Sequence, residues 1–338
     1  MPLGSDRRAC QSVDLMSPDL ASYERIIVAV SGGKDGTACL LALLESGAPA
    51  ERIELWHHEV DGAGRPFMDW PSTGPYVAAL ARDFSLPLYR SWREGGFERE
   101  MLRDNAPIAP VVFETPDGTI RAGGQGPMGT RMRFPQVSAS LSVRWCSASL
   151  KVDVADRAVR GQDRFLNRRT LVVTGERAEE SPARARYAAF EPHRTDTRNG
   201  TRRRRHVDHW RPVHAWVEAE VWAILRRWRV MPAYPYQAGF SRLSCAFCIF
   251  GNADQFATLK WMDANRFAKL VRYEKNFGCT IKRARGLDEL SSEGRAYQAA
   301  RSCPDLVAAF LSDGALRTVL TEDWTLPAGT FGSGEGPV

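Results

Sequence analysis

The 338-residue sequence lacks a run of about 18 apolar residues, the length that a membrane-spanning helix needs, so we expect no membrane span. Its first 19 residues are polar and lack the apolar core of a signal peptide, and we therefore expect a cytoplasmic protein. No internal repeat is present. The hydrophobic fraction of 43% and the charged fraction of 25% are typical of a globular protein with a large core.

Cysteine is scarce: there are seven, an odd number, in a chain expected to stay in a reducing compartment. A disulfide framework is therefore not expected, and metal ligation or thiol reactivity is the better interpretation. Cys10 in the polar N-terminal segment and Cys39 on an apolar helix face are given no role. The candidates that remain are Cys146, Cys245, Cys248, Cys279 and Cys303.

A glycine turn follows the first strongly apolar segment, and together they read Ile26-Ile27-Val28-Ala29-Val30-Ser31-Gly32-Gly33-Lys34-Asp35-Gly36-Thr37. A buried strand that leads through such a turn into a helix exposes backbone N–H groups, which bind phosphate together with the helix dipole. Gly32 and Gly33 allow close approach of an anion, and Lys34 adds positive charge. Ser31 and Thr37 offer hydroxyl groups. The turn has neither the Walker-type nor the dinucleotide spacing of glycines, and an ordinary strand–helix turn is the alternative.

Residue spacing predicts strands at 25–30, 52–60, 86–91 and 170–174, and helices at 36–46 and 72–84. This alternation indicates an α/β fold with a doubly wound parallel sheet. Ligands bind such sheets at the carboxyl ends of the strands. The glycine turn, Asp61 and Gly175 each follow a predicted strand, so we expect them to lie along one edge of the sheet.

From the N-terminus, the predicted parts are a flexible tail (1–20), a nucleotide-binding α/β domain (21–240), a helical part that begins with a Cys-x-x-Cys motif (241–326) and a tail (327–338). Apolar residues at helical spacing predict helices at 215–228 and 253–277. A Gly- and Pro-rich stretch at about 105–136 is predicted to be an irregular insertion in the α/β domain.

Positive charge is concentrated between Arg184 and Arg211, where nine arginines and three acidic residues give +6. The segment includes the run Arg202–Arg205 and reads as an exposed basic loop that binds nucleic acid, or as a solvated loop without a partner. The six histidines of the chain show no metal-ligand spacing. Those near the loop, His206, His209 and His214, are predicted to lie on the surface.

Five blocks resemble the superfamily of adenosine 5′-phosphosulfate (APS) and 3′-phosphoadenosine 5′-phosphosulfate (PAPS) reductases. They are Ser-Gly-Gly-Lys-Asp at 31–35, Arg-Trp-Cys-Ser-Ala-Ser-Leu-Lys at 144–151, Thr-Gly-Glu-Arg-Ala-Glu-Glu-Ser-Pro-Ala-Arg at 174–184, Trp-Arg-Pro-Val-His-Ala-Trp at 210–216 and Cys-Ala-Phe-Cys at 245–248. The first block is similar to the pyrophosphate loop of the PP-loop ATP pyrophosphatases. The set is most similar to the iron–sulfur ATP pyrophosphatases of DNA phosphorothioation systems, the DndC-like proteins. It implies an adenine nucleotide alpha hydrolase-like, Rossmann-like sheet.

The resemblance implies a site that cleaves ATP between the α- and β-phosphates and passes AMP to a substrate. Lys34, Asp35, Lys151 and Arg177 are its expected catalytic residues, and Asp35 with an acidic partner is expected to hold Mg²⁺. The expected nucleotide-binding residues are Ser31, Gly32, Gly33, Gly36, Thr37, Asp61, Gly175, Glu180, Ser181 and Arg184. Guanidinium groups suit bidentate phosphate contacts, whereas a lysine supplies a point charge. Gly36 departs from the family, which usually has serine there.

The resemblance also implies a [4Fe–4S] cluster, for which Cys146, Cys245 and Cys248 supply three thiolates. Ser147 stands where the cluster-binding reductases have a second adjacent cysteine. Cys279, which follows a glycine turn, is the preferred fourth ligand, with Cys303 as the other choice. The fourth ligand could also be missing, and the alternatives to the cluster are Zn²⁺, no metal at all and a redox-active Cys-x-x-Cys pair.

These observations favour an ATP-dependent sulfurtransferase that modifies nucleic acid, with a sulfur donor such as a cysteine desulfurase as its partner. An APS or PAPS reductase is the second hypothesis, although no cysteine follows Cys303 to serve as the C-terminal catalytic thiol of those enzymes. The third is a nucleic-acid-binding or assembly subunit with an inactive nucleotide loop, for which Gly36 is the main argument.

Overall fold

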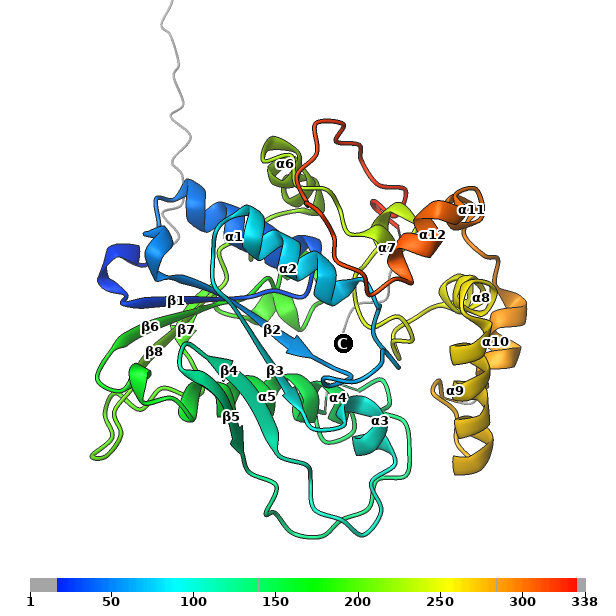
Figure 1. Ribbon diagram of the computed structural model, residues 1–338, viewed down its shortest axis with the longest axis horizontal. Helices are drawn as coiled ribbons and strands as arrows, with labels where there is room; N and C mark the ends of the chain where they lie inside the picture. Colours follow the sequence, from blue (N-terminus) through cyan, green and yellow to red (C-terminus); the bar gives the residue numbers. More distant parts are fainter. Residues whose placement is uncertain (1–16, 139, 284, 333–338) are drawn as a thin grey trace, which may run out of the picture.

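The computed structural model describes residues 17–138, 140–283 and 285–332. Cys10, most of the predicted N-terminal tail and residues 333–338 lie outside these ranges. In the described residues one eight-stranded sheet runs through the molecule in the order β5-β4-β3-β2-β1-β6-β8-β7 (Figure 1). Its strands are β1 (Arg25–Ala29), β2 (Ile53–Glu59), β3 (Leu88–Arg93), β4 (Val111–Thr115), β5 (Gly118–Ala122), β6 (Arg169–Val173), β7 (Phe190–Pro192) and β8 (His206–Trp210).

The five central strands are parallel to one another, and the edges are antiparallel. β1 lies between β2 and β6, so that Val28 pairs with Leu55 on one side and with Val173 on the other. β4 and β5 form an antiparallel hairpin beside β3, and β7 pairs antiparallel with β8. The predicted doubly wound α/β fold is therefore confirmed, with antiparallel strands added at both edges.

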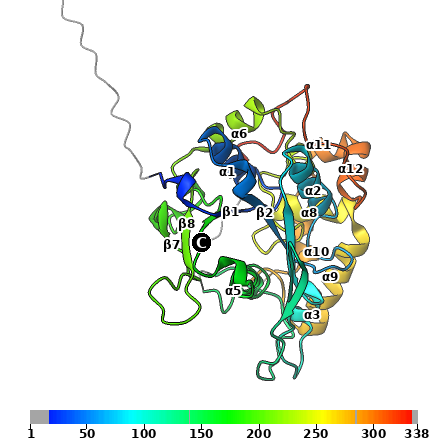
Figure 2. The ribbon, with the colours of Figure 1, turned by 60° about the vertical axis from the view of Figure 1, so that its left-hand side comes forward.

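Helices cover both faces of this sheet, as Figure 2 shows for α1 and α5. They are α1 (Lys34–Glu45), α2 (Thr73–Asp83), α3 (Gly96–Met101), α4 (Trp145–Ser147), α5 (Asp153–Arg160), α6 (Glu218–Arg227) and α7 (Tyr234–Gln237). Side chains alternate along β1: Ile26 and Val28 pack with α1, α2 and α6, whereas Ile27 packs with α5. This burial of both faces explains the continuous apolar run of the first strand.

Besides the apolar clusters on the two faces of the sheet, a further hydrophobic core joins α3 to the C-terminal helices, which lie at one side of the sheet (Figure 1). These helices are α8 (Ala253–Met262), α9 (Ala264–Phe277), α10 (Leu287–Glu293), α11 (Gln298–Arg301) and α12 (Pro304–Phe310). The single helix predicted at 253–277 is two helices, because Asp263 interrupts it and accepts the backbone N–H of Arg266 to cap α9. Across the described ranges, none of the helices combines the length and the apolar character needed to span a bilayer.

Two other predictions differ from the structure. The stretch at 105–136 is not wholly irregular, because it contains the β4–β5 hairpin, whose two strands are joined by a turn at Pro116-Asp117. The basic segment from Arg184 to Arg211 is not one loop, because it contains β7 and β8. Between α4 and α5 the chain forms a π-helical turn, Ala148–Val152, whose Ser149 carbonyl accepts the buried Nε–H of Arg93 at 2.9 Å.

Candidate functional site

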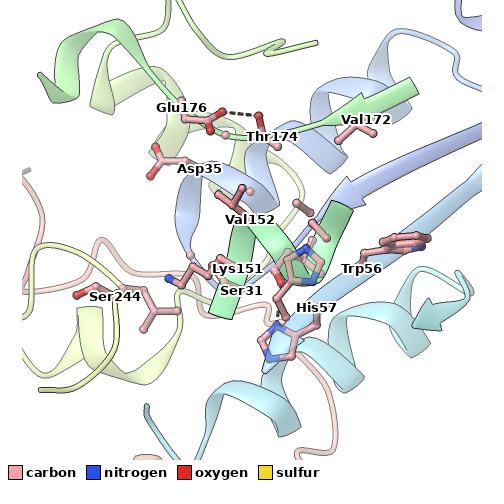
Figure 3. Close-up of a pocket in the computed structure, with 18 of the residues that line it drawn as sticks. Ser31, Asp35, Trp56, His57, Lys151, Val152, Val172, Thr174, Glu176 and Ser244 are labelled. Carbon is pink, nitrogen blue, oxygen red and sulfur yellow. Dashed lines mark hydrogen bonds between the residues drawn. The ribbon is translucent and has the colours of Figure 1, made fainter. Parts of the chain in front are cut away.

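A cavity of about 420 Å³ opens where β1, β2 and β6 end, and Figure 3 shows side chains that line it. Its walls come from the glycine turn, the end of β2, the π-helical turn, the loop after β6 and residues 242–245. The cavity therefore lies at the carboxyl edge of the parallel strands, as expected for this fold. The predicted site residues that line it are Ser31, Gly33, Lys34, Asp35, Gly36, Lys151, Gly175, Glu180, Arg184 and Cys245.

The glycine turn places the first turn of α1 against the cavity. Gly32 has a φ of +75°, which favours glycine, and an added Cβ would lie 3.2 Å from the side chains of both Leu243 and Tyr76. The Thr37 hydroxyl donates to the carbonyl of Gly33 at 3.1 Å, so it is used within the helix and does not line the cavity. The prediction that Thr37 offers its hydroxyl to phosphate is thus not supported by this geometry.

Gly36 has a packing explanation. A Cβ at this position would lie 3.0 Å from the carbonyl oxygen of Ala29 at the end of β1. The missing serine hydroxyl therefore accompanies a close approach of α1 to β1, and the departure from the family pattern does not itself indicate an inactive loop.

Gly175 and Arg177, in the loop after β6, contact Asp35 in the first turn of α1. An added Cβ on Gly175 would lie 2.6 Å from the carbonyl carbon of Asp35, so only glycine fits between β6 and α1. Arg177 is 3% exposed, and its Nε–H donates to Asp35 Oδ1 at 2.5 Å. Its Nη1 donates to the Trp216 carbonyl at 3.2 Å and to Glu179. Arg177 does not line the cavity; it clamps Asp35 in place of the phosphate contact expected from the sequence.

Lys34 is also more enclosed than the sequence suggests. Its Nζ lies 3.6 Å from Asp35 Oδ2 and 3.9 Å from Glu218 Oε1. The ring centroids of Tyr236 and Trp222 are 5.5 and 5.8 Å from the same atom. Burial alone would lower the pKa of Lys34, but Tyr236, Asp35 and Glu218 outweigh it and hold the pKa above its usual value. The ammonium group stays charged, with two acids beside it.

In the part of the chain that the structure describes, Lys151 is one of five lysine and arginine residues that line the cavity, with Lys34, Arg184, Arg194 and Arg242. It lies deep in the molecule, at the end of the π-helical turn, but its side chain remains open to solvent through the cavity. Burial alone would lower the pKa of Lys151, whereas Cys245, Asp69 and Cys146 raise it above its usual value. An anion that enters the cavity therefore meets a charged ammonium group opposite the glycine turn.

The loop after β6 supplies another of these cations. Arg184 lines the cavity and forms an ion pair with Glu180, which also accepts the backbone N–H of Arg177 at 2.8 Å. Ser181 does not line the cavity; its hydroxyl accepts the backbone N–H of Arg184 at 3.2 Å and shapes the loop.

Asp61 lies outside this cavity, in a neighbouring one of about 390 Å³. Its Oδ2 accepts the backbone N–H groups of Phe67, Met68 and Asp69 at 2.7 to 2.9 Å, so it organises the loop after β2. Burial and the nearby carboxylate of Asp69 raise the pKa of Asp61 to about 6. Asp69, which the sequence reading did not select, lines both cavities.

Four buried or half-buried histidines also line the cavity: His57, His58, His193 and His209. The prediction that His209 lies on the surface is wrong, since it is 7% exposed within β8. Its Nδ1 faces Arg211 at 3.1 Å and its Nε2 faces the Thr174 hydroxyl at 2.6 Å. The Thr174 hydroxyl also donates to Glu176 (Figure 3). Four of the five residues of β8 are buried, so both faces of the strand are covered and no alternation of apolar and polar residues marks His209 in the sequence.

The basic segment is largely engaged within the protein. Arg205 is buried and its Nη2 donates to the Arg160 carbonyl at 2.6 Å, while Arg203 forms an ion pair with Asp163. Arg202 and Arg204 are exposed. Only part of the run Arg202–Arg205 is therefore accessible to a polyanion, because Arg205 is buried directly before β8.

The cysteines lie beside the cavity, but the predicted cluster set is not assembled. Electrostatic contacts link Cys146, Cys245 and Cys248 to Lys151, and burial raises the pKa of the Cys245 thiol well above its usual range. Cys279 follows the end of α9 at Gly278. Within the ranges that the structure describes, no group of three or more His, Cys, Asp or Glu side chains is placed to hold a metal ion. As placed in this structure, these residues therefore do not form the ligand set that a [4Fe–4S] cluster or a structural Zn²⁺ site needs.

Part of the chain is similar to a known protein family. Residues 126–250, which include Lys151, Gly175, Arg184 and Cys245, match the phosphoadenosine phosphosulfate reductase domain family. The match covers the middle part of the chain and shows a likeness to that domain there. The chain is also 26% identical over 268 residues to an uncharacterized 37.8 kDa protein of Escherichia phage 186, with 74% of each chain covered.

Two solved structures show partial likeness of fold. One is the phosphoadenylyl-sulfate (PAPS) reductase from Candida auris in a phosphate complex, with 16% identity, a TM-score of 0.32 and coverage of 62% of this chain and 75% of that chain. The other is FMN adenylyltransferase from Candida glabrata in complex with FAD and inorganic pyrophosphate, with 12% identity, a TM-score of 0.36 and coverage of 67% and 56%. At these TM-scores neither structure bears on the activity of this chain.

Proposed function

We propose that the protein binds ATP, cleaves it between the α- and β-phosphates and transfers AMP to an acceptor as the activating step of a sulfur transfer. The observation that carries the proposal is the meeting of three separate segments in one cavity. The first turn of α1, Lys151 of the π-helical turn and Arg184 of the loop after β6 all line it. Backbone N–H groups and several lysine and arginine side chains around one space suit a polyphosphate.

Each segment has a definite task in this proposal. The start of α1 holds the β- and γ-phosphates, and Lys151 faces the bond that breaks. When an acceptor oxygen attacks the α-phosphorus, the α–β bond breaks and its electrons leave on pyrophosphate. A preorganised ammonium group stabilises that developing charge. Asp35, clamped by Arg177, keeps Lys34 in place through their 3.6 Å contact. Mg²⁺ is treated as part of the ATP substrate complex.

The test is pyrophosphate release from ATP with Mg²⁺, measured with a coupled phosphate assay. Lys151→Ala is expected to lower the rate at least roughly a hundredfold, in the range reported for removal of a single transition-state donor. Lys260→Ala is the matched control, because this lysine pairs with Asp288 on α10 and does not line the cavity. Equal rates in the two variants would reject the site.

PAPS reduction is a second candidate, because the matched family is the phosphoadenosine phosphosulfate reductase domain. The same preparation should then be offered PAPS and a dithiol reductant, with sulfite as the measured product. Sulfite without pyrophosphate release from ATP would favour this second candidate over ATP cleavage.

As acceptor we propose a nucleic acid that contacts the exposed Arg202 and Arg204, with sulfur supplied by a partner such as a cysteine desulfurase. A double Arg202→Ala, Arg204→Ala variant should bind polynucleotide more weakly and with a flatter salt dependence. Arg227→Ala is the control, since this arginine is exposed on α6 and pairs with Glu45. An unchanged salt slope in the double variant would exclude this contact.

A further inference from the structure

Tyr236 joins the glycine turn to the segment that leads into the Cys-x-x-Cys motif. It belongs to α7, and its side chain is 1% exposed, with its ring packed edge-on against Trp222 at 5.2 Å. Its hydroxyl oxygen accepts the backbone N–H of Lys34 at 3.1 Å and that of Leu243 at 3.2 Å. Lys34 is the first residue of α1, so this oxygen satisfies one of the N–H groups that a helix start leaves free.

The hydrogen of the same hydroxyl remains available. A phenolic group accepts through its oxygen lone pairs and donates one O–H, and here the two N–H donors approach the oxygen. The O–H bond must therefore point away from Lys34 and Leu243. Tyr236 lines the cavity, and a Cβ added to Gly33 would lie 3.7 Å from its hydroxyl oxygen and 3.6 Å from Ser31 Oγ. The O–H is therefore left to donate to a group that enters the cavity beside Gly33.

We propose that Tyr236 is a further phosphate-binding residue, whose O–H donates to a phosphate oxygen held in the glycine turn. The inference rests on the proposed function, since it names a contact of the same nucleotide. Burial raises the pKa of Tyr236, so the hydroxyl keeps its proton at neutral pH.

The same oxygen also holds residues 242–245. Leu243 lies two residues before Cys245, and both line the cavity. A phosphate that fixes the Tyr236 hydroxyl therefore also fixes the approach to the cysteine motif. Because binding couplings are reciprocal, the position of this segment must in turn affect phosphate affinity. Through its two hydrogen bonds, Tyr236 connects the start of α1 to the segment that leads into the cysteine motif.

The test is calorimetric titration of the full chain with inorganic pyrophosphate. Tyr236→Phe is expected to bind roughly tenfold more weakly or worse, the usual effect of losing a hydrogen bond to a charged group. Tyr234→Phe is the matched control, a half-buried tyrosine of the same helix that does not line the cavity. Alkylation of Cys245, located by mass spectrometry, adds a second readout: pyrophosphate should slow it in the wild type and have little effect on it in Tyr236→Phe.

The outcomes separate the two proposals. If the wild type binds neither pyrophosphate nor ATP, the proposed function fails. If it binds pyrophosphate and Tyr236→Phe binds equally well or more tightly, only the Tyr236 assignment fails. If Tyr236→Phe does not fold, amide hydrogen exchange of the wild type decides. The amides of Lys34 and Leu243 should become more protected with pyrophosphate, and unchanged or lower protection would overturn the assignment.

Discussion

Arg177 offers a sharp test of whether a family motif residue acts on substrate or on the protein. Its guanidinium is buried, donates to Asp35 at 2.5 Å and also contacts Glu179 and the Trp216 carbonyl. Removing one partner of a buried ion pair costs about 3–5 kcal/mol. Lys34 remains near Asp35, whose side chain is 18% exposed, so the lower end applies, about 3 kcal/mol for Arg177→Ala.

That cost converts into a measurable melting shift. Unfolding entropy near the transition is about 2.1 cal/mol/K per residue, which for this 338-residue chain gives roughly 0.7 kcal/mol/K. Scanning calorimetry should therefore show Arg177→Ala melting about 4 °C below the wild type. Arg184→Ala, which removes a cavity-lining arginine with an ion pair to Glu180, should lower ATP affinity but shift melting by less than about 2 °C. An unshifted Arg177→Ala that has lost ATP binding would refute the clamp.

Three further predictions concern pH, packing and metal. Burial lowers the pKa of His209 to about 4 and that of His193 to about 3. Between about pH 6.5 and pH 4 the unfolded chain therefore binds more protons than the folded chain, so the free energy of unfolding falls as the pH drops. The expected loss is up to about 3 kcal/mol for His209. Asp61, with its pKa raised to about 6, opposes this loss, because its folded state gains the proton first; urea midpoints against pH should still show a net decrease toward pH 4. Gly175→Ala should abolish ATP binding by calorimetry, since its Cβ meets Asp35 at 2.6 Å, whereas Gly74→Ala, with open space around its Cβ, should bind normally. Anaerobic iron and sulfide analysis should find less than one cluster per chain; four irons per chain would show that the cysteine segments close around a cluster on loading.

The sequence predicted the central part of the fold because its signals are local. The apolar run before Ser31 and the alternation of strands and helices are determined by burial on both faces of a parallel sheet. The edge hairpin β4–β5 was missed because its outer strand is mostly exposed and carries no apolar alternation. β8 was missed because charged residues occupy it, and their partners, such as Tyr23 for Asp208, lie far away in the sequence.

The sequence predicted which residues lie at the site better than it predicted what their side chains contact. Lys151, Gly175 and Arg184 meet the glycine turn in one cavity, as strand ends and motif spacing indicated. The inward clamp of Arg177 and the internal use of the Thr37 hydroxyl depend on side-chain direction, which no one-dimensional pattern specifies. Tyr236 lacked any signal, since a lone buried tyrosine after a proline resembles ordinary core.

The π-helical turn at Ala148–Val152 contains one residue more than a regular α-helical turn would, and this extra residue sets the direction in which Lys151 points. A regular helix advances about 100° per residue, so deleting one residue from this turn would swing the preceding segment by that angle relative to α5. The Ser149 carbonyl would turn with that segment, and the Nε–H of Arg93 would lose the acceptor that it now has. A variant with one residue deleted from this turn should keep the sheet, but the ammonium group of Lys151 and the thiol of Cys146 should no longer face the same side.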